Sequence, residues 1–424
     1  MIHLFHEQAF QIMKRDWLAV VLLAGWIGMV AVQNAHAQDP GITETTIRVG
    51  AILPLAGDSE IYGLNMKKGI EAAFAGQTVQ GRILEFEALN NFDESITTIE
   101  VARPLIDKGV FIMLGSVGTF TSFKLMPMLA ANRIPALGFY TAGEIETDGD
   151  LLNIRPGHAQ EVSALVAAAI TAGVKPAQLC LFAQNDADGL ASIEGLKTEL
   201  AKLPETQAIL KSLDQIADMM MGGINPALNN MGPVGLYLRG TVRLRDAYQS
   251  LKNWEQTSGQ PCRLVVIVAT PKVAADFIAY ALYKKEAWLF SAISITVAGD
   301  ALKNLLLENG VRNQMLLTQV TPPLNSSLPI VADARAVLGP QLNSISMEGY
   351  IAGRLFFTVA RAMNGPLTRA SFLKAVRRQS LDLGGFKIDF TKGNPGSSLV
   401  LLTFLNGDQY EPFSAEVLKK MIQN

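Results

Sequence analysis

The chain has 424 residues, of which 49% are hydrophobic and 17% are charged, and its formal net charge is -2. This composition allows a large buried core and excludes a disordered chain. A nucleic-acid-binding protein would normally carry a basic excess on one face, so the charge balance indicates no nucleic-acid partner. At roughly 150 residues per domain, the length predicts two or three domains.

The first 37 residues are typical of an export signal. Lys14 and Arg15 precede an apolar stretch at residues 17–32, and Ala35-His36-Ala37 matches the small-x-small cleavage pattern. Residues 1–37 are therefore expected to be a cleaved signal peptide, and the mature protein is expected in the periplasm. The alternative is an uncleaved membrane anchor, but the stretch is shorter than the roughly 20 residues that a spanning helix needs.

Little catalytic or metal-binding chemistry remains after the signal. The mature chain keeps one histidine, His158, and two cysteines, Cys180 and Cys262. Zinc sites need three or four ligands, and a Ser-His-Asp or Cys-His arrangement would depend on His158, which is predicted to lie in a loop. We therefore expect no enzyme, no metal and no cofactor. The cysteines are expected as two separate buried residues, and a disulfide is the alternative that an oxidising compartment permits.

Short strands alternate with helices from residue 47 onward. Single helices between successive strands predict a parallel sheet with helices on both faces, and ligands bind such sheets beyond the carboxyl ends of the strands. The expected strands are 47–53, 83–88, 110–114 and 134–138, and the expected helices are 64–75, 95–108 and 120–132.

The pattern then repeats, which predicts a second doubly wound unit and a hinged pair of lobes. Residues 152–155 are expected to be an extended link between the two. Residues 215–261 are the least regular part, with Met219-Met220-Met221-Gly222-Gly223 and Asn229-Asn230-Met231-Gly232-Pro233 indicating loops. The expected helices here are 161–172, 189–202 and 273–283, and the expected strands are 178–183, 263–269 and 288–295.

Several short motifs together resemble one family, the type I periplasmic solute-binding proteins of the leucine/isoleucine/valine-binding group, which serve ABC importers. The resemblance covers nearly all of the mature chain and rests on the order and spacing of the motifs. They are Ile47-Arg48-Val49-Gly50, Pro54-Leu55-Ala56-Gly57, Leu114-Gly115-Ser116, Asn153-Ile154-Arg155-Pro156-Gly157, Glu348-Gly349-Tyr350-Ile351-Ala352 and Leu383-Gly384-Gly385-Phe386.

The resemblance implies an α/β fold of two doubly wound parallel-sheet lobes, joined by a three-crossover hinge and closing over a ligand. It places lobe one at residues 39–155 plus 320–380 and lobe two at residues 156–319 plus 381–424. It also implies a small-molecule ligand, a monomer, and the permease subunits of an inner-membrane transporter as partners.

The family's ligand contacts map onto specific residues. Thr119 matches the position whose hydroxyl and neighbouring amides hold a ligand carboxylate, although a plain helix N-cap is the alternative. Thr141 matches a second contact and Tyr62 an aromatic on the first loop. For Phe120, Phe123 and Phe139 core packing is the favoured alternative. In lobe two, Asp186 lies in a shortened form of a family loop, and Thr270 takes the place of a frequent aromatic. The expected ligand-binding residues are Tyr62, Thr119, Phe120, Phe139, Tyr140, Thr141, Asp186 and Thr270.

The ligand class follows from what the cleft lacks. Amino-acid binders of the family carry an acid where this chain reads Ala292-Ile293-Ser294-Ile295-Thr296. An unpaired buried ammonium costs several kcal/mol, which counts against an α-amino acid unless Asp186 or Asp300 compensates. The family favours a branched-chain or aromatic amino acid, whereas the aromatic residues favour an aromatic carboxylate or a sterol-like lipid. The alternative functions are a lipid carrier in a non-ABC trafficking system and a ligand sensor.

Overall fold

The computed structural model describes residues 39–143, 149–226, 231–312 and 314–423. The expected signal peptide lies outside these residues. The fold is that of one unit, Pro40–Asn424, whose strands form two large sheets and a two-stranded ribbon of β12 (Leu381–Asp382) and β13 (Lys387–Ile388).

The first sheet has six strands in the order β2-β3-β1-β4-β5-β6, and all neighbours are parallel except β2 and β3. The central strand β1 is buried along most of its length, as expected for a parallel strand covered on both faces. The strands are β1 (Thr46–Leu53), β2 (Thr78–Val79), β3 (Arg82–Asn90), β4 (Ile112–Leu114), β5 (Ala136–Leu137) and β6 (Leu151–Leu152).

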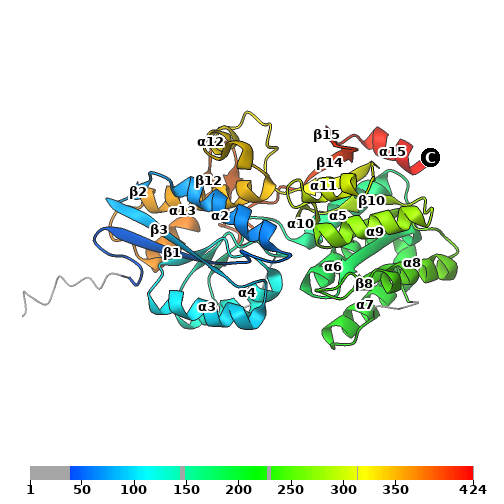
Figure 1. Cartoon of the computed structure of the whole chain (residues 1–424), viewed down its shortest axis with the longest axis horizontal. Helices are drawn as coiled ribbons and strands as arrows, with labels where there is room; N and C mark the ends of the chain where they lie inside the picture. The colour runs from blue at the N-terminus through cyan, green and yellow to red at the C-terminus, as the bar shows by residue number, and fades with distance from the viewer. Residues whose placement is uncertain (1–38, 144–148, 227–230, 313, 424) are drawn as a thin grey trace, which may run out of the picture. The chain divides into compact units, whose positions relative to one another are not determined.

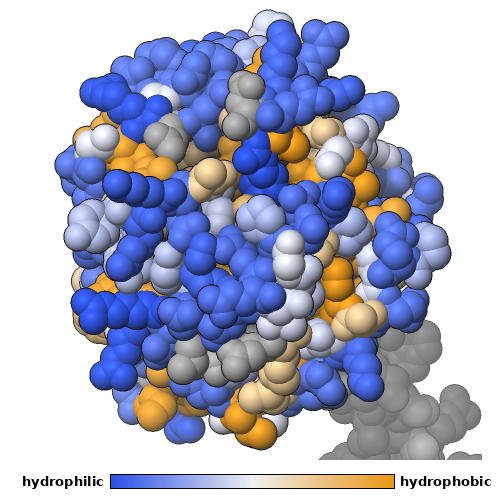
Figure 2. All heavy atoms as spheres, turned by 90° about the vertical axis from the view of Figure 1, so that its right-hand side faces the viewer, coloured by the Kyte–Doolittle hydropathy of each residue, from blue (hydrophilic) through white to orange (hydrophobic). Residues whose placement is uncertain are grey.

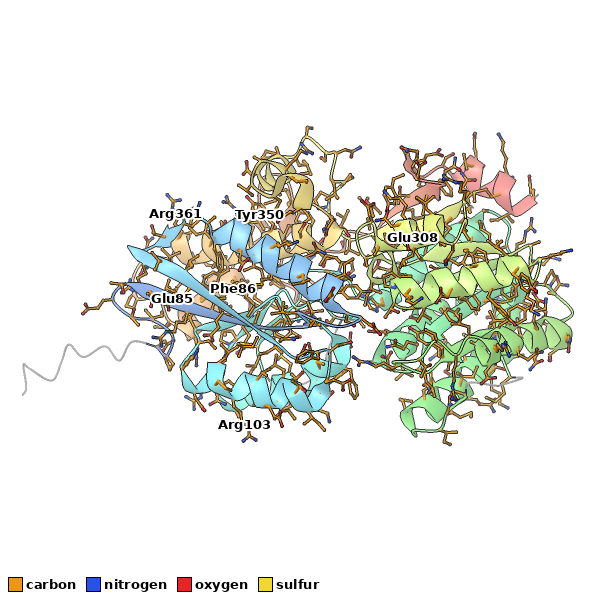
Figure 3. All side chains as sticks on the ribbon, in the orientation of Figure 1. Glu85, Phe86, Arg103, Glu308, Tyr350 and Arg361 are labelled. Carbon is orange, nitrogen blue, oxygen red and sulfur yellow. A yellow bond between two sulfur atoms is a disulfide. The ribbon has the colours of Figure 1, made fainter. Side chains whose placement is uncertain are left out.

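Helices cover both faces of this sheet, with α2 and α13 on one face and α3 and α4 on the other (Figure 1). Phe86 of β3 packs edge-on against Phe74 of α2 with ring centroids 6.2 Å apart, whereas Arg103 of α3 is exposed and points away from the sheet (Figure 3). The helices are α2 (Glu60–Phe74), α3 (Ser95–Asp107), α4 (Thr119–Ala131), α12 (Pro329–Leu338), α13 (Ser344–Ala362) and α14 (Arg369–Val376).

The second sheet has seven strands in the order β15-β14-β11-β10-β9-β7-β8. The five strands from β11 to β8 in this order are parallel to one another, while β14 and β15 are antiparallel to their neighbours. The strands are β7 (Leu179–Gln184), β8 (Val234–Tyr237), β9 (Leu264–Val268), β10 (Leu289–Ala292), β11 (Met315–Gln319), β14 (Leu401–Asn406) and β15 (Gln409–Pro412).

The helices around the second sheet bury their apolar stripes in one core with it. They are α5 (His158–Thr171), α6 (Ala187–Leu200), α7 (Gln207–Met221), α8 (Arg245–Ser258), α9 (Pro271–Tyr283), α10 (Ser294–Val297), α11 (Ala301–Glu308) and α15 (Ala415–Gln423).

The prediction that residues 215–261 are irregular is wrong. Met219 to Met221 belong to α7, whose buried face of Ile209, Leu213 and Ile216 lies earlier in the helix, and β8 and α8 follow. The polar helix α8 was missed because it buries few large apolar side chains. Asn229 and Asn230 lie outside the described residues.

Three further predictions differ from the structure in where an element begins or ends. The expected strand at 288–295 ends at Ala292, and the residues after it turn into α10. Leu151 and Leu152 pair with β5 as an edge strand instead of forming only an extended link. His158 begins α5 and does not lie in a loop. The first two differences arise because pairing with a neighbouring strand, which the local sequence does not show, decides how far a strand extends.

Cys180 and Cys262 form a disulfide, so the expectation of two separate cysteines is wrong. Their Cα atoms are 5.8 Å apart, which suits a bridge. Cys180 lies in β7 and Cys262 just before β9, and these two strands are neighbours in the sheet. The pairing of β7 with β9 therefore brings together cysteines that are 82 residues apart in sequence. A disulfide is typical of proteins in an oxidising compartment.

The chain crosses between the two sheets three times: after β6, after β11 and before β14. The first and third crossings lie side by side, because the Asn153 amide donates to Asn394 Oδ1 at 3.0 Å and the Gly396 amide donates to the Asn153 carbonyl at 2.7 Å. Phe386 and Phe390 still pack in the core of the first sheet, whereas the sequence places the third boundary at residue 380. The lobe boundaries remain a prediction.

None of the described helices combines the length and the apolar character that membrane crossing requires.

Candidate functional site

The predicted ligand-binding residues follow the strands of both sheets. Thr119 begins the helix after β4, Tyr140 and Thr141 follow β5, and Asp186 and Thr270 follow β7 and β9. Loops beyond the carboxyl ends of parallel strands are the usual place for a ligand in such folds.

Thr119 connects the strand ends of the two sheets. Its Oγ1 donates to Asp188 Oδ1 at 2.7 Å and accepts from the Ala142 amide at 2.7 Å. The helix N-cap is Gly118, whose φ of 107° is in the region that favours glycine, so Thr119 is not a plain N-cap. Asp188, in the first turn of α6, is thus the partner of Thr119, and it was missed from the sequence.

Asp188 has an unusual electrostatic environment. Its side chain is 18% exposed, and burial, followed by the charge of Asp186, raises its pKa to about 7. His158 Nδ1 lies 3.6 Å from Asp188 Oδ1. Burial and the charge of Arg155 hold the pKa of His158 well below its usual value, so the ring is neutral at neutral pH.

Two tyrosine rings pack against each other near Asp188. Tyr62 and Tyr140 have ring centroids 5.8 Å apart, and the Tyr62 hydroxyl donates to the Ile295 carbonyl at 2.9 Å. The Arg155 guanidinium lies 4.2 Å from the Tyr140 ring centroid. Burial raises the pKa of both tyrosines well above the ordinary value, so both hydroxyls stay protonated.

A buried network of charges lies at the first crossing. Glu161, which is 0% exposed, accepts from the Arg155 guanidinium at 3.0 Å, from the Ser294 amide at 2.8 Å and from Thr318 Oγ1 at 2.5 Å. Arg155 Nη1 lies 3.7 Å from Glu348 Oε2. The network joins the end of β6 to β10 and β11. Arg155 and Glu348 lie within the motifs that carry the family resemblance, but neither was predicted to have a role.

A second contact between the strand ends of the two sheets lies beside Phe120. Arg239, which follows β8, forms an ion pair with Asp93 Oδ2 at 2.5 Å and donates to the Asp93 carbonyl at 2.8 Å. Its guanidinium lies 5.3 Å from the Phe120 ring centroid. Phe120 is 45% exposed and Phe123 is 37% exposed, so core packing does not describe them.

The remaining predicted residues have structural partners. Phe139 is 1% exposed and belongs to the core around α3 and α4. The Thr141 hydroxyl donates to the Gly143 carbonyl at 3.2 Å. Asp186 caps α6 by accepting from the Asp188 amide at 3.0 Å. The Thr270 amide donates to the Tyr237 hydroxyl at 3.3 Å. The structure thus brings Tyr62, Thr119 and Tyr140 together and leaves Phe139 in a core.

The described part of the chain contains no group of three or more His, Cys, Asp and Glu residues that could hold a metal ion. The residues that follow the strands instead supply hydroxyls, carboxylates, backbone amides and aromatic rings. Such a set can bind a small molecule by hydrogen bonds and apolar contact.

Known proteins share this architecture. The model of a family described as periplasmic binding protein matches residues 46–205. A possible leucine/isoleucine/valine-binding protein from Rhodopirellula baltica SH 1 is 26% identical with a TM-score of 0.73, over 91% of this chain and 100% of that chain. No curated protein matches the sequence.

Two more distant structures share the fold alone. A fatty acid ABC transporter substrate-binding protein from Thermomonospora curvata is 14% identical with a TM-score of 0.67, over 90% of this chain and 96% of that chain. An ABC transporter solute-binding protein from R. palustris in complex with 4-hydroxybenzoate is 15% identical with a TM-score of 0.66, over 87% of this chain and 96% of that chain.

These matches confirm the resemblance. The chain has the two-lobe α/β fold of type I periplasmic binding proteins and is similar to proteins of the leucine/isoleucine/valine-binding group. The similar proteins are solute-binding proteins of ABC-type systems.

Proposed function

We propose that this chain is a periplasmic solute-binding protein that encloses a small, largely hydrophobic solute and delivers it to an inner-membrane ABC transporter. The observation that supports the proposal is the hydrogen bonding between residues that follow strands of the two sheets. The main example is the bond from Thr119 Oγ1 to Asp188 Oδ1 at 2.7 Å. A solute among these groups would contact both lobes and would favour closure through its higher affinity for the closed form.

The hydrophobic character of the solute is supported by the rings of Tyr62 and Tyr140 and by the partly exposed ring of Phe120. Burial of apolar solute area would contribute roughly 25 cal/mol per Å². The first turn of α4 supplies backbone N–H groups that suit a carboxylate. Leucine, 4-hydroxybenzoate and fatty acids each join a carboxylate to an apolar body. A branched-chain or aromatic amino acid, or an aromatic carboxylate, fits this description.

Native mass spectrometry of protein purified from the periplasm, followed by solvent extraction, tests the proposal. A bound small molecule with an apolar body should be recovered. Recovery of a sterol would favour the lipid carrier instead. If no molecule co-purifies and calorimetry detects no binding of L-leucine, 4-hydroxybenzoate or a medium-chain fatty acid, the proposal is wrong.

The site itself is tested by Thr119→Ala, which should weaken binding of the recovered solute about tenfold, the usual effect of losing one hydrogen bond to a charged group. Thr171→Ala, at the exposed end of α5, is the control and should bind like the wild type. Unchanged affinity of Thr119→Ala in calorimetry would remove Thr119 from the site.

A further inference from the structure

An arginine on a tight turn joins the strand ends of the two sheets. Arg239 follows β8 in the turn 238–241, in which the Thr241 amide donates to the Leu238 carbonyl at 3.1 Å. Gly240 has a φ of 71°, a value that suits the third position of a type II turn. The turn therefore fixes the backbone from which the Arg239 side chain reaches the first sheet.

The acceptor on the first sheet is Asp93, in the loop after β3. Arg239 donates to the Asp93 carbonyl at 2.8 Å, and its guanidinium lies 2.5 Å from Asp93 Oδ2, which also accepts from the Ser59 hydroxyl at 3.0 Å. The same guanidinium lies 5.3 Å from the Phe120 ring centroid. Contact with both the carbonyl and the carboxylate of one residue fixes the direction of the guanidinium as well as its charge.

The loop that carries Asp93 has an uncommon backbone conformation. Phe92 and Asp93 have φ values of 53° and 59°, in the left-handed region that residues other than glycine seldom adopt. Two asparagine side chains hold this loop, because Asn90 Oδ1 accepts from the Phe92 amide at 3.0 Å and Asn91 Oδ1 accepts from the Asp93 amide at 3.1 Å. Such strain is typical of functional segments, and here it directs Asp93 toward the second sheet.

We infer that the Arg239–Asp93 pair is a latch that stabilises the closed form in the absence of solute. The inference rests on the proposed function, because a latch has a role only where two lobes open and close. Every partner of Arg239 named above belongs to the chain itself, so the pair favours closure before a solute arrives and must break for its release. The two side chains are 29% and 26% exposed, so dissolved salt can screen the pair.

Small-angle scattering of solute-free protein tests the latch. Any bound solute is removed by unfolding in guanidinium chloride and refolding, and circular dichroism checks the fold. The radius of gyration is measured for wild type, Arg239→Gln, Asp93→Asn and the double variant between about 0.05 and 1 M KCl, where the screening length falls to about 3 Å. Asparagine at position 93 tolerates the left-handed backbone. Arg243→Gln is the matched control, because Arg243 is an exposed arginine that also follows β8.

Loss of the pair should shift the equilibrium toward the open form by about three- to tenfold, between the effect of an exposed ion pair and that of a hydrogen bond to a charged group. At low salt, wild type and Arg243→Gln should therefore have a smaller radius than the other variants, and KCl should enlarge it toward theirs. The single and double variants should share one radius that salt does not change, because each lacks the same pair.

Equal radii of wild type and Arg239→Gln at low salt would overturn the inference. So would a salt dependence that Asp93→Asn retains, because a merely structural role of Arg239 would leave that dependence in place. If a variant does not fold, a wild-type radius that is constant over the salt range also overturns it. These measurements use no solute, so failure of the latch leaves the proposed function to be decided separately by the mass spectrometry described above.

Discussion

At the scale of single residues, buried charge is concentrated at the first crossing. Glu348 has a side chain that is 11% exposed and lies near Arg155 and Glu161. Burial raises its pKa to about 7; the charge of Arg155 opposes this rise, and that of Glu161 adds to it. The carboxyl group therefore holds its proton more tightly in the folded protein than in the unfolded chain.

We expect the contribution of Glu348 to stability to fall as pH rises through this range. A proton bound more tightly in the folded state stabilises that state below about pH 4.5, and the stabilisation is lost as pH rises toward 7. Glu348→Gln should reduce the fall in the free energy of unfolding over this pH range, by about 3 kcal/mol at most. Urea unfolding between pH 4.5 and 8 measures the slope, with the exposed Glu100→Gln as control. An identical slope in wild type and Glu348→Gln would contradict the expectation.

Of the two residues in the Thr119–Asp188 contact, only Thr119 was predicted from the sequence. Thr119 was found because it follows a strand and matches a family position. Its partner Asp188 was not found, because the two residues are 69 positions apart and only the fold brings them to 2.7 Å. Neither side of the contact between Arg155 and Ser294 was predicted, because these residues are 139 positions apart.

At the scale of elements, α2 and α13 meet through two glycines. A Cβ at Gly69 would lie 2.1 Å from the Ser346 carbonyl oxygen, and one at Gly349 would lie 2.3 Å from the Met66 carbonyl oxygen. Both neighbours are backbone atoms, so the helices would have to separate. Close contact between two helix backbones thus depends on glycine at these positions.

Gly69→Ala should therefore destabilise the protein by about 1–3 kcal/mol, the usual cost of overpacking a core. This outcome is informative because alanine favours a helix over glycine by about 1 kcal/mol. Thermal unfolding should show a lower Tm than the wild type, whereas the exposed Lys68→Ala on the same helix should stay close to it. A Tm equal to or above that of the wild type would show that the helices can separate without cost.

Elements with apolar periodicity were predicted well, as β1 and α3 illustrate. Helix α8 was not, because its buried side includes Ala247 and Ser250 beside Leu251 and Trp254, a weak pattern in sequence. Burial of this helix is decided by its contact with β8. Packing against a neighbour can stabilise a helix whose own sequence pattern is faint.

At the scale of the whole molecule, the chain crosses three times between the two sheets, and the first and third crossings lie side by side, which provides a place for hinge motion. The face on which α8 and α15 lie is mostly hydrophilic, with separate small apolar patches (Figure 2). That face therefore suits contact with water. The disulfide between β7 and the segment before β9 lies within the second sheet and leaves the hinge unrestrained.

A saturating solute should make the molecule more compact in solution. The radius of gyration from small-angle scattering should decrease when the extracted solute is added back, because the solute shifts the population toward the closed form. Thr119→Ala at the same solute concentration should show a smaller decrease. An unchanged radius at a concentration that calorimetry shows to be saturating would contradict hinge closure.

The sequence by itself determined the fold class, most of the first unit and the family resemblance, because apolar periodicity and short motifs are local properties of the chain. The tertiary structure alone decided the disulfide, the Thr119–Asp188 contact and the charged network of Arg155 and Glu161. These features join residues far apart in sequence, and their distances depend on which strands are neighbours and where the chain crosses between sheets.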